Sequence, residues 1–421
     1  MYDVIGIGIG PFNLSLAALI KPTGLRCLFI DDKPSFAWHA GMAFPSARLQ
    51  VSHLKDCVSL VDPTSEFSFL NFLLQNGRLN AFVNRRSGGV SLKEFGQYYS
   101  WVADQLPYLS FGQKALEVRP ETSHFRITTS EAEYRAHHIV LGLGIRPDVP
   151  DCVRPLLGER VYHAADYLNR TPPAAGERVL LVGAGQSGSE VIEQLLAGPP
   201  LKQILWVTPH DNLEPMDDCA FTNEYYTPAY FRHFQAQALA RRREWVQVNR
   251  LSSDGVSLDL ANQLFNKLYE RRFVEGDNDG VRLIVSACLG VLRQNGTGFE
   301  AILKCTETAA TRKVLVDRVI LATGFVPHSP SFLDPIMQLA WIEDDLPRIN
   351  ADCSLETRIA LPGKIYFQNR TRIQHGLQNA NLSLVAYRNA TIVNSMIGKK
   401  FYTVDTDLSM LSRMAELGEE R

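Results

Sequence analysis

Short apolar runs alternate with segments of helical periodicity along the first part of the chain, which is the pattern of an α/β protein. Residues 2–10 are predicted to form a strand, residues 12–20 the helix that follows, and residues 25–31 a second strand. Two later segments, 67–74 and 92–106, have apolar residues at helical spacing and predict a buried and an amphipathic helix. The chain is therefore expected to begin with a strand–helix–strand unit.

Further apolar runs indicate where the chain leaves its first domain and enters a second. Residues 138–147 form an apolar strand that ends in a glycine/proline breaker, and we expect this to be the exit from the first domain. A strand at 178–182 followed by a helix at 189–196 begins a second unit. The strand predicted at 318–325 is expected to return the chain to the first domain. Alternation at 124–129 predicts a half-exposed hairpin.

Each strand–helix junction carries a glycine-rich turn. The turns read Gly6-Ile7-Gly8-Ile9-Gly10-Pro11 and Gly183-Ala184-Gly185-Gln186-Ser187-Gly188. Glycines let the backbone approach a pyrophosphate, and the helix that follows offers unpaired N–H groups and a partial positive charge. Two such turns predict two dinucleotides, of which the usual pair is a tightly held flavin (FAD) and a nicotinamide that reduces it. The predicted contacts are Gly6, Gly8, Gly10, Pro11, Gly183, Gly185, Gln186 and Ser187.

These elements predict an α/β fold with two Rossmann-like dinucleotide-binding domains, one inserted into the other. We expect the FAD domain to be discontinuous and the NADP(H) domain to contain a small helical segment that closes over the substrate. The predicted ranges are 1–170 and 317–397 for FAD, 171–316 for NADP(H), 213–275 for the helical segment and 398–421 for a C-terminal tail.

An acid follows the second predicted strand at Asp31, with Asp32 as a weaker candidate. A carboxylate at this point of a dinucleotide-binding unit accepts a hydrogen bond from a ribose hydroxyl. The alternative is an acid that caps the turn at the strand end. We place Pro11 at the third-glycine position of the fingerprint, where proline is tolerated because its missing N–H would have no partner in the first helical turn.

Length, charge and cysteine content exclude several classes of protein. A chain of 421 residues predicts two or three domains. The net charge of −2 gives no reason to expect nucleic acid, and the arginines at 241–243 are interpreted as a solvated helix face. No apolar run reaches the roughly 18 residues of a membrane span, and because the first predicted strand begins at Tyr2 we expect no signal peptide. Seven cysteines without a C-x-x-C pair indicate a cytoplasmic protein and argue against a flavin disulfide reductase.

Blocks of distinctive local sequence accompany the glycine turns. They include Pro11-Phe12-Asn13-Leu14-Ser15, Trp38-His39, Leu49-Gln50-Val51, Leu54-Lys55-Asp56, Asp62-Pro63-Thr64, Phe69-Leu70-Asn71-Phe72-Leu73, Ser189-Glu190, Phe221-Thr222-Asn223-Glu224-Tyr225, Ala322-Thr323-Gly324-Phe325 and His375-Gly376. In this order they resemble the N-hydroxylating flavin monooxygenases of siderophore biosynthesis, a family of lysine, ornithine and diamine N-hydroxylases. The resemblance is strongest to the lysine and cadaverine branches.

The resemblance implies an enzyme that uses FAD, NADPH and O₂ to N-hydroxylate a small-molecule amine, as a homo-oligomer without a metal. The expected substrate is an aliphatic diamine such as cadaverine, with L-lysine as the alternative. Another class B monooxygenase, acting on sulfur or ketones, should carry a Phe-x-Gly-x-x-x-His stretch, which the sequence lacks. A non-catalytic nucleotide-binding regulator would leave Lys55 and Asn223 without a reason to match a substrate pocket.

The same resemblance assigns cofactor contacts outside the glycine turns. It implies that Trp38 stacks on the flavin, that His39 donates or accepts a hydrogen bond there, and that Gln50 contacts the edge of the ring. Thr323 and Gly324 are expected to complete cofactor binding. Trp38 as a core residue and Gln50 as an exposed residue of an alternating strand are the alternatives.

Lys55 and Asn223 are the predicted substrate contacts. Lys55 has apolar neighbours, so it is expected to be partly buried and to need a partner. In the family the matching lysine holds the carboxylate of an amino-acid substrate, whereas an ion pair with Asp56 or Asp62 is the competing interpretation. Asn223 matches a substrate-binding asparagine of ornithine hydroxylases, although asparagines in such loops are commonly turn residues.

Two departures from the family pattern bear on specificity. Pro209-His210 stands where members that prefer NADPH often have an arginine for the 2′-phosphate, so His210 or the arginines at 241–243 are the candidate replacements. Ser252-Ser253-Asp254-Gly255 occupies the stretch where ornithine enzymes have Asn-Tyr-Ser, which favours a diamine over an α-amino acid. No side chain is assigned as a general base, because the cofactor supplies the difficult chemistry.

Overall fold

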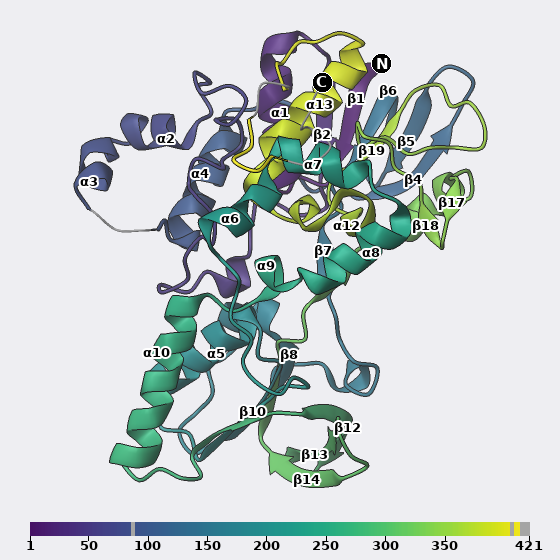
Figure 1. The fold of residues 1–421 in the computed structure, drawn as a ribbon. Helices are drawn as coiled ribbons and strands as arrows, with labels where there is room; N and C mark the ends of the chain where they lie inside the picture. The colour runs from purple at the N-terminus through teal and green to yellow at the C-terminus, as the bar shows by residue number, and fades with distance from the viewer. Residues whose placement is uncertain (86–88, 405–407, 413–421) are drawn as a thin grey trace, which may run out of the picture.

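The computed structural model describes residues 1–85, 89–404 and 408–412. Two large sheets lie in the two lobes, in the upper and lower halves of Figure 1; the first is mixed, because three of its strands, within residues 115–141, pair antiparallel, and the second is parallel. In the first sheet, strand β1 (Tyr2–Ile7) pairs in parallel with β2 (Cys27–Ile30) and β6 (Glu133–Leu141). The other strands are β3 (Leu109–Ser110) beside β2, β19 (Ile365–Phe367) and β5 (Phe125–Thr129) beside β6, and β4 (Ala115–Pro120) beside β5.

The second sheet is entirely parallel and has β9 (Arg178–Val182) at its centre. Its strand order is β11 (Val281–Ile284), β10 (Gln203–Val207), β9, β15 (Arg318–Leu321) and β8 (Val161–His163). These central strands are continuous apolar runs because layers cover both faces of the sheet. One layer is the antiparallel sheet of β12 (Ala287–Asn295), β13 (Gly298–Cys305) and β14 (Thr311–Val316), and the other contains helices α5 (Gln186–Ala197) and α10 (Leu258–Tyr269).

Helices fill one side of the first lobe. Helix α1 (Pro11–Ile20) is buried along most of its length and packs against α13 (Val385–Ile397) and α4 (Leu92–Asp104). Helices α2 (Phe69–Gln75) and α4 begin at serine N-caps, which accept hydrogen bonds from backbone N–H groups of the first turn. The remaining short elements are α3 (Leu79–Asn84), α11 (Asp334–Met337), α12 (Arg372–His375), the paired strands β7 (Ile145–Pro147) and β16 (Phe325–Pro327), and the hairpin of β17 (Ile342–Glu343) and β18 (Leu346–Pro347).

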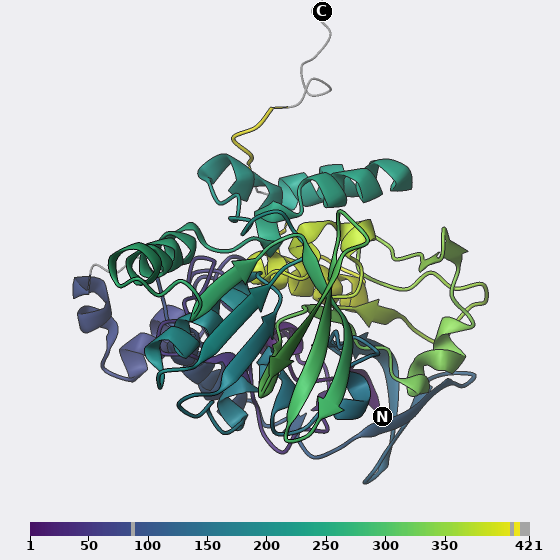
Figure 2. The same cartoon turned by 90° about the horizontal axis from the view of Figure 1, so that it is seen from below.

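The segment predicted at 213–275 is helical, and it bridges the two lobes. Its elements are α6 (Ala220–Asn223), α7 (Pro228–Gln235), α8 (Leu239–Val248), α9 (Leu251–Asp254), α10 and a π-helical turn (Glu270–Val274). Tyr230, Phe234 and Val246 pack against Leu377 of the first lobe, whereas α10 packs on α5 of the second. In Figure 2, α7 and α8 lie across the top of the molecule, outside the sheets.

The predicted domain boundaries are wrong at two strands. Strand β15 pairs with β9 and β8, so residues 318–321 and 161–163 belong to the second sheet and not to the first. The chain returns through β16, which pairs with β7, and supplies β19 to the first sheet. Both β6 and β15 follow antiparallel strands and end in Gly-containing turns, and each is the last strand of its lobe before the chain crosses.

Other local predictions had mixed outcomes. The helices at 92–106 and 189–196 and the alternating strand at 124–129 are confirmed. The helix at 67–74 is confirmed, but only one face is buried, because Leu74 is 61% exposed. Gln50 does not lie in a strand; its loop makes a single bridge from Arg48 to Ser91.

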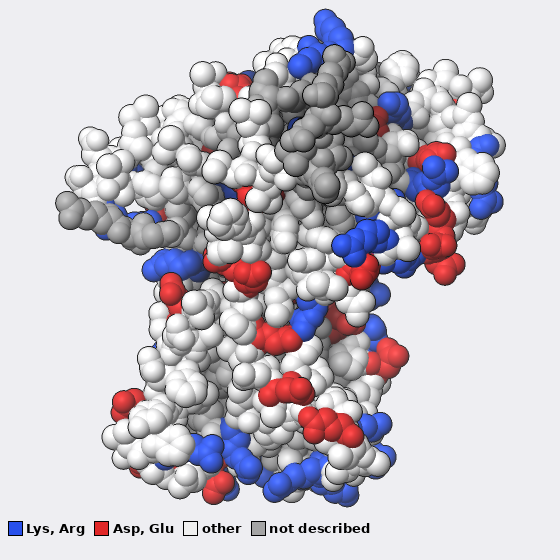
Figure 3. Space-filling model, viewed as in Figure 1, with Lys and Arg blue, Asp and Glu red and all other residues white. Residues whose placement is uncertain are grey.

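On the face shown in Figure 3, basic and acidic side chains are interspersed. None of the helices in the described part of the chain has the length and apolar character needed to cross a membrane.

Asp317 and Arg178 join the starts of β15 and β9. The carboxylate accepts hydrogen bonds from the Arg178 backbone N–H and from Nε and Nη2 of its guanidinium. These bonds to Arg178 lower the pKa of Asp317 from 3.8 to about 2. The stabilisation is complete above the ordinary carboxyl pKa and is lost as the pH falls toward 2.

We expect Asp317→Asn to lower the free energy of unfolding at pH 7 by about 1–2 kcal/mol, after allowance for partial exposure. Glu300→Gln is the control, because its contact with the exposed Lys313 is worth about 0.5 kcal/mol or less. Urea unfolding of the two variants at pH 7 measures the difference, and equal losses would contradict the prediction.

Candidate nucleotide and substrate sites

The first glycine turn follows β1 at the carboxyl edge of its sheet. Gly8 has a φ of +90°, and a Cβ there would lie 2.3 Å from the carbonyl oxygen of Gly142. Gly10 is the extended N-cap of α1, and a Cβ there would meet no protein atom within 4 Å. Gly8 is thus required by the protein itself, whereas Gly10 leaves open space at the helix N-terminus for a ligand.

The second turn repeats this geometry after β9. A Cβ at Gly183, with a φ of +110°, would lie 2.1 Å from the carbonyl oxygen of Ala322. Gly185 is the extended N-cap of α5 and again faces open space. Corresponding residues of the two turns therefore have the same roles: Gly8 corresponds to Gly183, and Gly10 corresponds to Gly185.

This correspondence corrects the assignment of the first fingerprint. Gly6 lies inside β1, where a Cβ would run into the ring of Phe29, so its small size serves strand packing. The position equivalent to the third glycine, Gly188, is Asn13 and not Pro11. The Asn13 side-chain amide donates to the carbonyl oxygen of Gly8 at 2.8 Å. Pro11 is at the first helical position, as its missing N–H predicts.

Asp31 follows β2 and contacts the glycine turn through its own carboxylate. It accepts hydrogen bonds from the backbone N–H of Ile9 at 2.6 Å and of Lys33 at 2.9 Å. The alternative of a strand-end acid that holds a turn is therefore what the structure shows. A carboxylate has further lone pairs, so a bond from a ribose hydroxyl stays a prediction.

The predicted flavin contacts outside the turn differ in their surroundings. Trp38 is half-buried and packs edge-on against Tyr99 with ring centres 5.1 Å apart, and its stacking on the flavin stays a prediction. His39 is exposed and has a φ of +48°, which is uncommon for a residue with a side chain and marks a constrained position. Gln50 is exposed in its loop.

A buried polar cluster after β19 escaped the sequence analysis. Gln368 donates from Nε2 to the side-chain oxygens of Asn13 and Asn389, which ties the cluster to the first turn of α1. Gln378 is fully buried, and neither its Nε2 nor its Oε1 has a hydrogen-bond partner among the described residues. Arg388 donates to the carbonyl oxygens of Gln368 and Gln378, and burial lowers its pKa to about 10. The sequence feature that could have indicated this cluster is the run of polar residues directly after a buried strand.

His375 belongs to the His375-Gly376 block of the family resemblance, and its ring makes hydrogen bonds within the fold. Its Nε2 donates to the carbonyl oxygen of Asn350, and its Nδ1 accepts from the Thr371 hydroxyl. Burial lowers its pKa to about 3, so the ring is neutral at physiological pH.

At the second turn, Gln186 connects α5 to the helical segment. Its Nε2 donates to Glu190 at 2.9 Å, and its Oε1 accepts from the backbone N–H of Ser257 at the start of α10. Burial raises the pKa of Glu190 to about 7. Ser187 is half-buried beside it in α5.

Thr323 and Gly324 lie at the carboxyl end of β15. The Thr323 hydroxyl donates to the carbonyl oxygen of Asp148. Gly324 has a φ of +85°, and its carbonyl oxygen accepts a hydrogen bond from His163 Nε2 at 3.1 Å.

Two of the arginines at 241–243, which were candidates to replace the arginine that binds the 2′-phosphate, form hydrogen bonds with the first lobe. Arg242 and Arg243 donate to carbonyl oxygens of Gln374 and Asp344 in the first lobe. His210 follows β10 and lies 3.6 Å from Glu214.

The structure brings the two predicted substrate residues into one region. Lys55 donates from Nζ to the Ser383 hydroxyl at 2.8 Å, and its ammonium lies 5.8 Å from the ring centre of Tyr226. Burial lowers the pKa of Lys55, an effect opposed by the charge of Asp218. Asn223, three residues before Tyr226, donates to Asp218 at 3.0 Å.

The proposed ion pair between Lys55 and Asp56 is not formed. The Asp56 carboxylate is buried and accepts from the backbone N–H groups of Val58, Ser59 and Phe69, at 2.6 to 2.9 Å. Its neighbour Lys55 points to Ser383 instead. Asp56 therefore holds the loop and the start of α2, which fixes the backbone from which Lys55 extends.

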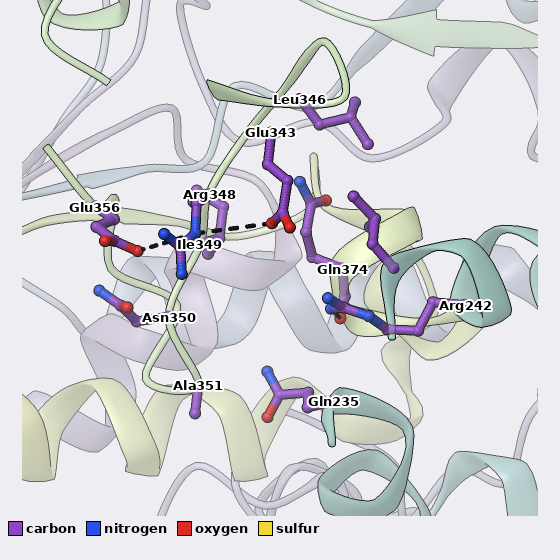
Figure 4. A pocket seen from close by; sticks show the side chains of 11 residues that line it. Gln235, Arg242, Glu343, Leu346, Arg348, Ile349, Asn350, Ala351, Glu356 and Gln374 are labelled. Carbon is purple, nitrogen blue, oxygen red and sulfur yellow. Dashed lines mark hydrogen bonds and ion pairs between the residues drawn. The ribbon is translucent and has the colours of Figure 1, made fainter. Parts of the chain in front are cut away.

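A pocket of about 200 Å³ lies away from both glycine turns, between α8, the β17–β18 hairpin and α12. Figure 4 shows Arg348 in it, paired with Glu343 and Glu356. Arg242 of α8 reaches the same pocket. It belongs to the seam where the helical segment packs on the first lobe.

Comparison with known proteins decides the family. A family model for L-lysine 6-monooxygenase/L-ornithine 5-monooxygenase matches residues 1–327. The chain belongs to this family. It is a flavin-dependent N-hydroxylating monooxygenase with FAD and NADPH as its cofactors, as the resemblance implied.

Individual relatives differ in substrate. The chain is 33% identical over 414 residues to the L-lysine N6-monooxygenase of Escherichia coli, which covers 97% of this chain and 96% of the relative. It is 32% identical over 422 residues to the putrescine N-hydroxylase of Shewanella oneidensis, covering 97% and 83%. The FAD-bound cadaverine monooxygenase DfoA of Erwinia amylovora has a TM-score of 0.90 at 30% identity, with 98% of each chain covered.

The two glycines of the first turn should fail in different ways when replaced by alanine. Gly8→Ala places a Cβ against the Gly142 carbonyl and should destabilise the protein, because of this backbone clash and not because of a clash with pyrophosphate. Gly10→Ala should keep the apoprotein's unfolding midpoint but weaken FAD binding by at least about tenfold. Unfolding curves and flavin absorbance of purified protein measure both. A Gly10→Ala protein with a full complement of FAD would contradict the site.

Glu190 should make stability fall with rising pH. Its folded pKa of about 7 exceeds the ordinary 4.5, so the penalty of the buried charge grows from pH 4.5 to 7 and stays above it. Glu190→Gln should therefore raise the free energy of unfolding at pH 8 by about 2–3 kcal/mol and leave it nearly unchanged at pH 4.5. Glu193→Gln on the same helix, paired with Lys267, is the control without a gain. Equal gains at both pH values would contradict the argument.

Proposed function

We propose that the first glycine turn and the polar cluster after β19 hold FAD, and that the second turn holds NADP(H). The open space at Gly10 and Gly185 suits a pyrophosphate, which approaches backbone closely at a helix N-terminus. The orphaned amide of Gln378 offers a buried donor and acceptor, and a flavin ring presents carbonyl and N–H groups along one edge. The proposal retains the cofactor contacts that the family resemblance implies for Trp38, His39, Gln50, Thr323 and Gly324.

We further propose that the substrate is an aliphatic diamine of cadaverine type, in a protein of the cytoplasm that forms a homo-oligomer. The observation that carries the substrate choice is the state of the serines at 252 and 253. Ser252 donates to the carbonyl oxygen of Asn249, and Ser253 contacts Asp254 and Arg372. Neither hydroxyl supports Lys55 as a second carboxylate donor, and a buried carboxylate wants more than one.

L-lysine is the second candidate, and Lys55 favours it. A half-buried ammonium held by a neutral hydroxyl is suited to a substrate carboxylate. The relatives named for lysine, putrescine and cadaverine all match this chain at similar identity.

The overall reaction consumes the amine, O₂, NADPH and a proton and yields the hydroxylamine, NADP⁺ and water. The bound flavin supplies hydride acceptance and oxygen activation. The chain's own part is to bind the amine, to keep bulk water away and to favour its neutral form, since under about one part in a thousand of a free alkylamine is neutral at pH 7. The aromatic ring of Tyr226 and the buried loop held by Asp56 shield the binding region around Lys55 from bulk water.

The substrate is tested by product formation and not by NADPH oxidation alone. We expect the kcat/KM for hydroxylamine formation to be highest with cadaverine, when cadaverine, putrescine, L-lysine and L-ornithine are compared. Catalase in the assay controls for peroxide released without hydroxylation. A higher kcat/KM for L-lysine than for either diamine would establish the second candidate. No hydroxylamine from any of the four would contradict the proposed substrate class.

A further inference from the structure

The proposed substrate region contains the carboxylate of Asp218, which the sequence motifs did not predict as a binding residue. Asp218 precedes α6 and accepts a hydrogen bond from Asn223 Nδ2 at 3.0 Å. It is exposed, and its charge opposes the lowering of the Lys55 pKa that burial causes. This carboxylate and amide thus lie on the segment whose Tyr226 ring centre is 5.8 Å from the Lys55 ammonium, although Lys55 is distant from it in the sequence.

The position of Asp218 is determined by its neighbours. Its backbone N–H donates to the carbonyl oxygen of Met216, and the N–H of Met216 donates to that of Val256. Asn223 occupies one of its oxygens, and a carboxylate accepts up to about four hydrogen bonds. Acceptor capacity therefore remains beside Lys55.

Three other acids of this region, Asp56, Glu224 and Asp254, are engaged in the folded chain. Asp56 receives the backbone N–H groups of its own loop. Glu224 accepts from Ser409 and Met410, and Asp254 pairs with Arg372. Asp218 differs from them because its recorded side-chain partner is the neutral amide of Asn223.

We propose that Asp218 binds the ammonium at the non-reacting end of the substrate and so determines specificity. A diamine places its second ammonium there, and an α-amino acid places its α-ammonium there with its carboxylate on Lys55. Asp218 also offsets the repulsion between Lys55 and a diamine. This inference rests on the proposed function, in that the reacting group is a terminal primary amine, but it does not depend on which of the two substrates is preferred.

Two substrate pairs isolate the non-reacting ammonium. Cadaverine and pentan-1-amine differ by that ammonium alone, and so do L-lysine and 6-aminohexanoate. Asp218→Asn keeps an oxygen for Asn223 but removes the charge. We expect it to lower kcat/KM for hydroxylamine formation at least about tenfold with cadaverine and L-lysine, mainly through KM, and to change it by less than about twofold with pentan-1-amine and 6-aminohexanoate.

Asp217→Asn is the matched control, because it removes the neighbouring exposed charge on the same loop. It should leave all four values within about twofold of the wild type, and Asp218→Glu should restore part of the discrimination. Equal losses with all four amines would indicate a merely structural role and overturn the proposal, as would an Asp218→Asn enzyme that still prefers cadaverine to pentan-1-amine.

The proposed function fails separately. Wild-type preference for L-lysine over cadaverine would remove the diamine assignment, while the lysine pair would still test Asp218. A wild-type enzyme that forms hydroxylamine from none of the four amines would overturn the proposed function and this inference together.

Discussion

Both nucleotide turns depend on one close approach between two backbones. The turn after β1 lies against the carbonyl of Gly142, and the turn after β9 lies against that of Ala322, so that neither leaves room for a Cβ at Gly8 or Gly183. This approach requires β1 to pair with β6 and β9 to pair with β15. Strand order and glycine placement therefore specify each other, and both helix N-termini are placed at the carboxyl edge of a sheet, where ligands of such folds bind.

The elements that the sequence predicted well are those with a strong local pattern. The strand at 178–182 has those bounds in the structure, and α1 and α4 begin and end within two residues of their predicted limits. Buried parallel strands and one-sided helices leave a periodicity that needs no knowledge of the partner. The glycine turns were found for the same reason, since a turn and a helix cap are local.

The features that the sequence did not specify depend on distant partners. Residues 318–321 have the composition of a central strand in either sheet, and the choice was made by pairing with β9 and β8. Asp31 satisfies a backbone N–H of the glycine turn, which composition cannot show. Neither Gln378 nor Asp218 lies in a recognisable sequence motif. Gln378 stands out because its amide is buried without a partner among the described residues, and Asp218 because its charge influences the pKa of Lys55.

The helical segment at 213–275 is predictable from local periodicity, but its position depends on contacts with both lobes. It is tied to the second lobe where Gln186 accepts the N–H of Ser257, and to the first where Arg242 donates to the carbonyl of Gln374. Its loop with Asp218 and Asn223 approaches Lys55, which is held in turn by Ser383. The geometry around the substrate is thus a product of how both lobes hold this segment. Because a fold hosts different specificities through such local contacts, relatives with one architecture can act on lysine, putrescine or cadaverine when a few charges in this loop and its partners change.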